Sequence, residues 1–472
     1  MEVLSNIRSL KNSLAPISRI PPEILSLIPD YFDEYDPDEA SITLTHVCRS
    51  WREIFISCPS LWTFLTFTDI DKTRTFIERS KSSPLNIYAS NLDDEVYLDD
   101  ALSLIIPHIP RLRSLTFRSD AIPDTLRNFH CNVPLLEDLE IHIDSPQAQI
   151  LDIPLLNGDL LSLRTLSLIG DMIHLPQKKM SSLREFCLSC TPGWITVTQI
   201  LDFLESAPLL HTISIADSIP NSSDSPPERI VTLGHLKILD ITTDMAHHIS
   251  KHLRIPAGVS FSVSAAFRNE AFPLLEYLRG TSPNIENLSH ITTIDLSFNP
   301  DGKCAALSGP SGSFSLSCWR ENPAISSITI DSHFFRSISP RILSTTERIT
   351  IFDYVHPVPA DVEEWPIFKT LLSTNNLHTL GLYRCNDKSF IFALDPGKNS
   401  FKIVLCPSLK ELIITVASRG LIDGLVSMAK ERASRGAKLS SITIIPATIP
   451  VSETEVLELR EHVTQVDCPV RV

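Results

Sequence analysis

A short apolar pattern that returns along most of this 472-residue chain limits what it can fold into. Apolar residues stand at positions 1, 4 and 6 of segments such as LRSLTF, LEDLEI, LKILDI and LKELII. With 43% apolar residues, the triplet alone arises by chance in about one frame in twelve, so its weight depends on the surrounding residues. The copies begin at Leu112, Leu136, Leu163, Leu183, Leu210, Leu236, Ile291, Ile325, Leu377, Leu409 and Leu439.

Spacing and flanking residues give the pattern a structural meaning. Successive copies lie mostly about 20 to 34 residues apart, and Pro or Ser often precedes position 1, as at Pro134 and Ser162. Position 9 is often small and polar, such as Asp144 or Cys385, and such a residue can turn the chain and bond free backbone groups. Side chains alternate along a strand, so positions 4 and 6 point inward and positions 3, 5 and 7 outward. One unit cannot bury its apolar side alone, which predicts stacked units.

These units resemble the leucine-rich repeat, Leu-x-x-Leu-x-Leu-x-x-Asn/Cys. The resemblance implies an α/β fold over residues 66–451, a solenoid in which short outer helices back a curved parallel sheet. Further elements are expected as degenerate or capping units: strands at 85–87 (the first strand), 261–263 and 349–351, and helices at 200–206, around Leu421, Leu425 and Met428, and from a cap at Ser452.

Two segments interrupt the periodicity. Residues 218–228 are rich in Ser and Pro and are expected to form a mobile loop. Residues 299–322 place three glycines around FSLSCW, which predicts a strand that projects from the stack. Either segment is a recognition element or an insertion without function, and the sequence favours the insertion.

The N-terminal segment, residues 18–65, follows a different pattern that predicts two helices. The first is expected to begin at IPPE, because proline lacks the N–H that a first turn leaves unpaired. The second is expected to begin with Asp36 as its cap and Pro37 in its first turn, and to carry one apolar stripe as far as Pro59. Two short helices this apolar cannot cover each other completely, so a following domain or a partner must cover the remainder.

Three pieces of this segment, IPPEIL, VCRSWR and PSLW, resemble the F-box motif in the same order over about 45 residues. Ile20 stands where that motif usually has Leu, and the acidic stretch 30–36 between the helices is longer than in many F-boxes. The resemblance implies binding to the Skp adaptor and, through it, to the cullin of a ubiquitin ligase. A helical hairpin that only caps the next domain is the alternative. The adaptor-binding positions that the resemblance implies are Ile20, Pro21, Ile24, Leu25, Ile28, Val47, Cys48 and Trp51.

The outward strand positions suggest where a target protein would bind. They are mostly polar in the first half of the array. In the second half Phe352, Tyr383 and Ile413 fall on adjacent units, and such an apolar-aromatic spot is typical of protein-binding anchors. The sequence leaves open whether C-terminal helices cover these three residues instead.

Charge, cysteine usage and motifs narrow the class of function. The net charge of −15 argues against nucleic acid and anionic membranes as main partners, and no apolar run reaches the ~18–20 residues of a bilayer span. Scattered cysteines favour a reducing compartment, the cytoplasm or nucleus. Phosphate-loop, nucleophile-elbow and zinc-protease motifs do not occur. The spacings His248–His252 and Cys187–Cys190 lack further ligands, so we expect no metal, cofactor or catalytic site.

The sequence thus predicts a protein that is not an enzyme, with an N-terminal helical extension (1–17), an F-box (18–65), a leucine-rich-repeat solenoid (66–451) and a C-terminal cap (452–472). Its expected role is substrate recognition in a Skp–cullin–F-box ubiquitin ligase, with an unknown target protein on the repeats. An interaction scaffold that binds the adaptor without directing ubiquitination is the alternative.

Overall fold

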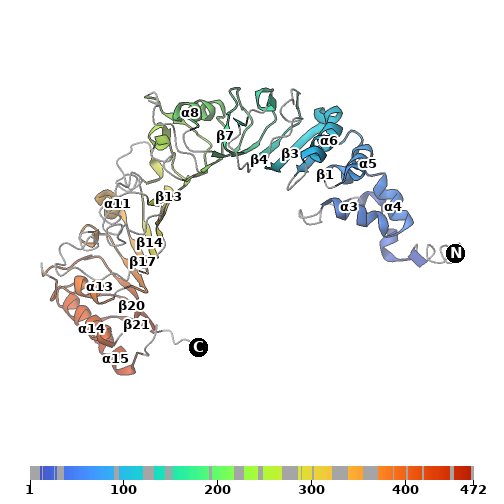
Figure 1. Ribbon diagram of the computed structural model, residues 1–472. Coiled ribbons are helices and arrows are strands. Elements are labelled where there is room, and N and C mark those ends of the chain that lie inside the picture. The colour runs from blue at the N-terminus through green and yellow to red at the C-terminus, as the bar shows by residue number, and fades with distance from the viewer. Residues whose placement is uncertain are drawn as a thin grey trace. The chain divides into compact units, whose positions relative to one another are not determined.

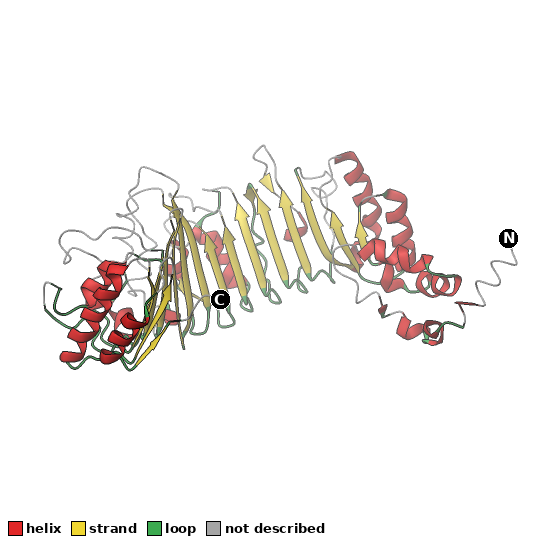
Figure 2. Ribbon diagram, turned by 90° about the horizontal axis from the view of Figure 1, so that it is seen from below, coloured by secondary structure: helices red, strands yellow, loops and turns green. Residues whose placement is uncertain are grey.

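The chain forms two compact units, the first of residues 1–210 with 216–225 and the second of 211–215 with 226–472. In each unit a mostly parallel sheet carries helices on one of its sides, so the fold is mixed α/β (Figures 1 and 2). The computed structural model describes residues 11–12, 14–25, 27–28, 37–67, 69–89, 95–120, 132–143, 150–151, 154–190, 194–216, 228–242, 248–267, 285–288, 290–299, 302–320, 338–353, 370–385, 387–399, 402–416, 419–446 and 451–468.

The sheet of the first unit grows by one parallel strand at a time, in chain order. Equivalent residues of neighbouring repeats stand side by side, so that Leu139 pairs with Leu115 on one side and with Leu166 on the other. The paired strands are β1 (Phe64–Thr66), β2 (Leu85–Ala89), β3 (Leu112–Ser119), β4 (Asp138–Ile143), β6 (Thr165–Gly170) and β8 (Glu185–Cys190).

The prediction that residues 85–87 form the first strand is wrong, because β1 precedes and pairs with β2. A three-residue strand has no room for the repeat pattern, which explains why the sequence did not reveal it. Away from the main sheet, β5 (Ile150–Leu151) pairs with β7 (Met172–Ile173).

Helices of the first unit lie mainly before the repeats and between them. The predicted helix at 200–206 is α8, whose first turn is closed by reciprocal hydrogen bonds between Thr196 and Gln199. The helical elements are η1 (Pro16–Arg19), α2 (Pro22–Leu25), α3 (Pro37–His46), α4 (Arg49–Ile56), η3 (Pro59–Trp62), α5 (Ile70–Ser80), α6 (Glu95–Ile105), η4 (Ile106–Arg111), η5 (Pro154–Asn157) and α8 (Val197–Ser206).

The second unit contains a longer sheet of the same kind. The predicted degenerate strands at 261–263 and 349–351 are parts of β13 and β17. The strands are β9 (Thr212–Ala216), β11 (Ile238–Thr242), β13 (Ser260–Phe267), β14 (Thr293–Asn299), β15 (Gly302–Gly309), β16 (Gly312–Arg320), β17 (Arg348–Phe352), β18 (Thr379–Tyr383), β19 (Glu411–Val416), β20 (Ser441–Pro446) and β21 (Gln465–Asp467), with β10 (Val231–Thr232) and β12 (Leu253–Arg254) paired separately.

Three of these strands, β14, β15 and β16, form a meander that departs from the repeat order. β16 pairs in parallel with β13, β15 runs antiparallel between β16 and β14, and β14 pairs in parallel with β17. The prediction of a projecting strand within 299–322 is therefore wrong, because both described strands of that segment lie in the sheet. Glycine makes the turn possible: Gly312 has a φ of +119°, and a methyl group at Gly309 would clash with the His290 carbonyl.

The core confirms the register read from the sequence. The first position of every repeat copy that falls on described residues is at most 6% exposed, and the inward positions that follow, such as Leu380 and Leu382, are fully buried. Each such leucine contributes about 1.5–3 kcal/mol of burial free energy. Ile325 lies outside the described residues, as does most of the predicted loop 218–228.

The capped helix predicted at the C-terminal end is present, but it does not close the array, because one more strand follows it. Helix α15 (Glu453–His462) is capped by Ser452, which exchanges hydrogen bonds with Glu455. The short strand β21 then pairs in parallel with β20, an addition that the sequence pattern did not indicate. The other helical elements of this unit are η6 (Ser250–His252), η8 (Glu286–Leu288), α11 (Pro340–Thr345), α13 (Asp387–Leu394) and α14 (Arg419–Ser434).

Among the helices of the described segments, none combines the length and apolar character that a bilayer crossing requires.

Candidate protein-interaction surfaces

The N-terminal helices differ from the two continuous helices that the sequence predicts. The second is wrong as predicted, since α3 ends at His46 and α4 begins at Arg49. The break lies at Cys48, whose backbone is extended (φ −160°, ψ 173°), and Arg52 Nε fixes it by donating to the Thr45 carbonyl at 2.9 Å. The first helix is a single turn, α2. The expected cap at Asp36 lies outside the described residues.

Buried aromatic residues fasten this helical segment to the rest of the first unit. Trp62 is fully buried, donates its indole N–H to the Phe55 carbonyl at 2.9 Å, and packs edge-on against Phe76 of α5 at 4.9 Å between ring centroids. The guanidinium of Arg79 lies over the Trp62 ring at 4.3 Å. Leu61 and Trp62, the last two residues of the PSLW piece, are thus part of the core.

Of the eight predicted adaptor-binding residues, three are exposed, four are half-buried and one is buried. Ile24 and Val47 are each 54% exposed, whereas Leu25 is only 2% exposed and belongs to the core. Pro21 is exposed, and Ile20, Ile28, Cys48 and Trp51 are half-buried.

Ile24 and Val47 belong to a larger group of exposed apolar side chains, which we call the N-terminal apolar set. Sixteen large apolar side chains are exposed among the described residues. Six of them form this set, and these six lie in the short stretch between residues 14 and 56. The N-terminal apolar set is Leu14, Ile17, Ile24, Leu27, Val47 and Ile56.

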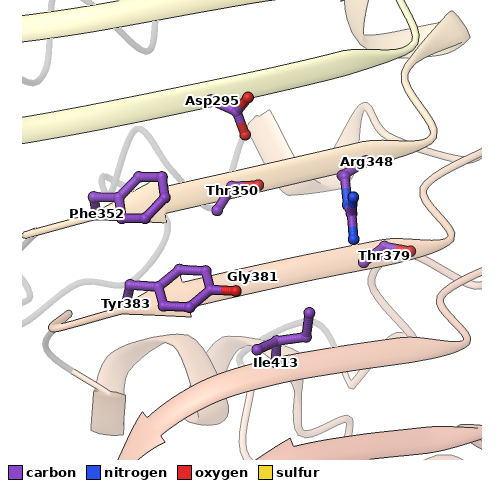
Figure 3. A pocket seen from close by; sticks show the side chains of 8 residues that line it. All are labelled: Asp295, Arg348, Thr350, Phe352, Thr379, Gly381, Tyr383 and Ile413. Atoms are coloured by element: carbon purple, nitrogen blue, oxygen red, sulfur yellow. The ribbon is translucent and has the colours of Figure 1, made fainter. Parts of the chain in front are cut away.

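The second surface is a furrow on the outward face of the sheet in the second unit. Its floor is one row of paired residues that crosses four strands: Asp295 of β14, Thr350 of β17, Gly381 of β18 and Ile413 of β19. Figure 3 shows Phe352 and Tyr383 along one side of this row and Arg348 and Thr379 along the other. Together these eight residues line a depression of about 330 Å³.

The structure brings together the three target-binding candidates, since Phe352, Tyr383 and Ile413 all line this furrow. The Phe352 and Tyr383 rings lie 4.9 Å apart between centroids, with their planes within 15° of parallel. All three side chains are only half-buried, so the C-terminal helices leave them accessible.

Gly381 gives the furrow its shape. A Cβ atom at this position would lie 3.0 Å from Cε2 of Tyr383 and 3.1 Å from Cγ2 of Thr350. The tyrosine ring therefore folds over the strand because glycine leaves room for it. Glycine inside a strand is a common sign of close approach by a ligand or by another chain segment.

A salt bridge joins the two residues that follow Phe352 and Tyr383 in the chain. Asp353 and Arg384 directly follow Phe352 and Tyr383, both adopt positive φ (59° and 53°), and their side chains join at 2.7 Å (Oδ1 to Nε) and 2.9 Å. The next residue, Cys385, is buried and donates its S–H to the Ile351 carbonyl at 3.3 Å. Position 9 of this repeat therefore bonds a backbone carbonyl, as predicted.

Behind the sheet, the C-terminal repeats contain a buried cation. Arg432 of α14 is fully buried and donates to the carbonyls of Leu405 (2.7 Å) and Cys406 (2.9 Å). Burial lowers the pKa of Arg432 and raises the pKa of the Cys406 thiol to about 11. These contacts close a loop between two repeats and point to a structural role.

The residues with metal-like spacing do not assemble into a site. Cys187 is half-buried on the outward face and Cys190 is buried on the other, as strand alternation predicts. His252 Nδ1 lies 3.2 Å from the Arg229 carbonyl, and His248 is exposed. Throughout the part of the chain that the structure describes, no three His, Cys, Asp or Glu residues cluster as metal ligands do.

No protein-family model matches the chain, and no curated protein matches its sequence.

Proposed function

We propose that this protein is a substrate-recognition subunit of a Skp–cullin–F-box ubiquitin ligase. In this proposal the N-terminal helices form an F-box that docks on the Skp adaptor, and the parallel sheets form a leucine-rich-repeat solenoid that holds a target protein. The chain itself performs no chemistry. It raises the local concentration of the target beside the ligase, as linked binding sites do.

The observation that carries the proposal is the N-terminal apolar set. Leaving Ile24 and Val47 each 54% exposed to water is unfavourable unless another surface covers them. Both residues fall in the pieces IPPEIL and VCRSWR that resemble the F-box, and a partner with an apolar groove would bury them. The buried Leu61 and Trp62 would connect that attachment to the first strand.

The test is co-expression of the tagged full-length chain with a Skp adaptor, followed by affinity capture. The double variant Ile24→Asp with Val47→Asp should reduce adaptor capture at least about tenfold, because it places two charges in an apolar contact. Leu25 is unsuitable for this test, since a charge at a position that is 2% exposed would unfold the segment.

A matched control separates docking from general surface effects. Leu135→Asp with Leu161→Asp introduces the same charges at positions that are 46% and 65% exposed in the same unit, outside the motif. This control should retain the adaptor. Equal capture by the Ile24/Val47 variant and by the wild-type chain, with both folded by circular dichroism, would refute the proposal.

A scaffold that binds the adaptor without directing ubiquitination rests on the same N-terminal apolar set. Capture of the cullin distinguishes the two functions. Recovery of the cullin together with the adaptor supports the ligase subunit, whereas recovery of the adaptor alone supports the scaffold.

A further inference from the structure

The furrow around Gly381 continues beyond the residues that line the depression, and its charges follow a pattern. The same row of paired residues runs on from Ile413 to Thr443 of β20 and Asp467 of β21. Asp295 lies in this row on one side of the apolar middle and Asp467 on the other, while Glu411 lies beside the row on β19. Beyond Asp295 the row crosses β15, β16 and β13 before it reaches Asp240 of β11. The furrow is therefore apolar in the middle and bordered by carboxylates.

The rest of the outward face has the same sign of charge. On the described strands of the second unit, positions 3, 5 and 7 carry one cation, Arg348, against four carboxylates. Many of the remaining outward residues are Ser or Thr. The carboxylates are those of Asp240, Asp295, Glu411 and Asp467.

We infer that this furrow binds an extended basic segment of a partner protein, with one large apolar side chain seated over Gly381. The apolar side chain contacts the rings of Phe352 and Tyr383 and the side chain of Ile413. Lysine or arginine residues on either side pair with the flanking carboxylates. The same pattern disfavours an acidic or phosphorylated segment, because the three carboxylates of Asp295, Glu411 and Asp467 outnumber the one cation, Arg348, along the furrow.

The strand spacing sets the register of such a segment. Asp295 lies two strands from Gly381, about 10 Å at ~4.8 Å per strand, which an extended peptide covers in about three residues. Glu411 lies one strand away and two residues along it, about 8 Å, which requires about two residues. The expected motif is basic-x-x-apolar-x-basic, read in either chain direction.

Polar groups beside the furrow suit the backbone of this segment. The Arg348 guanidinium and the Thr379 hydroxyl line the side opposite the aromatic rings, and the Thr350 hydroxyl lies in the floor between the two sides (Figure 3). Guanidinium and hydroxyl groups can donate hydrogen bonds to peptide carbonyls. Thr379 also donates to a carboxylate oxygen of Glu411 at 3.0 Å, which holds that carboxylate at the edge of the furrow. Arg348 is thus placed to donate to the backbone of the segment.

This inference gives the partner chemistry of the proposed function and rests on it for its biological meaning, but its test does not involve the adaptor. The probes are end-blocked, fluorescein-labelled peptides, Gly-Lys-Ser-Ser-Leu-Ser-Lys-Gly and its reversed sequence, with counterparts that replace Lys by Glu or Leu by Ser. Fluorescence polarisation with the purified full-length chain measures their binding. We expect a lysine–leucine peptide to bind at least about tenfold more tightly than either counterpart.

Two pairs of variants locate the peptide. Tyr383→Ser should weaken binding about tenfold, whereas Ile238→Ser, at an outward apolar residue of β11, should not change it. Asp295→Asn should weaken binding about two- to fivefold and reduce its salt dependence, whereas Asp240→Asn should not.

Three results would overturn the inference: equal or tighter binding of the glutamate peptides, equal binding by the Tyr383→Ser and wild-type chains, or no binding of any peptide at about 1 mM. If adaptor capture remains intact in these cases, the inference alone fails. Loss of adaptor capture with peptide binding retained is instead a failure of the proposed function.

Discussion

The parallel sheets and the N-terminal helices differ in how far their apolar side chains are exposed to water. In the sheets the inward residues are sealed, as with Leu380 and Leu382, which have no exposed surface. In the helices Ile24 and Val47 keep more than half of their surface exposed. The sheets therefore bury the apolar surface of their inward side within the protein, whereas the helical segment leaves part of its apolar surface exposed.

Geometry explains the difference. A strand places alternate side chains on opposite sides, and each stacked repeat covers the apolar side of the one before it. Helix α2 is a single turn, and the break at Cys48 leaves Val47 in a connection rather than on a packed helix face. A segment built in this way can bury its remaining apolar surface only against a further surface.

The largest change in stability is expected for a substitution inside the sheet, and it tests this difference in burial. Leu382→Ala should lower the free energy of unfolding by about 3 to 5 kcal/mol, because a fully buried side chain is replaced by a cavity. Ile238→Ala, at a residue that is 47% exposed on the same sheet, should change it by less than about 1 kcal/mol. Urea denaturation of the two variants measures both values. Similar losses of unfolding free energy would contradict the conclusion that the inward side of the sheet is buried and the outward side is not.

A somewhat smaller change in stability tests whether water is excluded from the interior behind the C-terminal repeats. The Cys406 thiol has its pKa raised from the ordinary 9.0 to about 11 by burial, so the folded chain keeps its proton at pH values where the unfolded chain loses it. This contribution to stability is complete below pH 9 and is lost as the pH rises through 11. The free energy of unfolding should fall by about 2 to 3 kcal/mol over that interval.

The Cys406→Ser variant is the matched control, because serine keeps a hydrogen-bond donor near Thr374 and the Leu371 carbonyl. The wild-type loss of stability between pH 9 and 11 should exceed that of the variant by the stated amount. Identical pH profiles would show that water reaches the thiol.

The smallest effect is expected at the N-terminal helices. Ile24→Ser with Val47→Ser should change the free energy of unfolding by less than about 0.5 kcal/mol, since both side chains already face water. Thermal or urea denaturation of the isolated chain measures this change. A loss of several kcal/mol would mean that these residues pack internally, and the contrast with the sheet would disappear.

Much of the repeat architecture could be predicted from the sequence because one residue pattern imposes one geometry. The triplet located the buried residues from Leu112 to Leu439, and strand alternation placed Phe352, Tyr383 and Ile413 on the outward face. Neighbour relations across strands could not be predicted in the same way, because they depend on the pairing register. The roles of Gly381 and Asp295 in the furrow emerged only from that register.

The elements that were missed share a physical cause. The strands β1 and β21 have three residues each, which is too short to show a period. The break at Cys48 interrupts an apolar stripe that is otherwise continuous, and a hydrogen bond from Arg52 stabilises it. The order of β14, β15 and β16 is a matter of chain connection, on which hydrophobic spacing is silent.

The meander has a consequence for how the chain reaches this fold. Neighbouring strands such as β18 and β19 pair residues that are 32 positions apart, whereas β13 and β16 join residues that are 53 positions apart. Closing the longer loop costs more conformational entropy, and non-local pairing slows folding. The β15–β16 hairpin forms from local contacts, but its attachment to β13 must await the return of the chain. The sheet of the second unit therefore becomes continuous only when two long-range pairings have formed, β13 with β16 and β14 with β17, one on each side of the β15 strand.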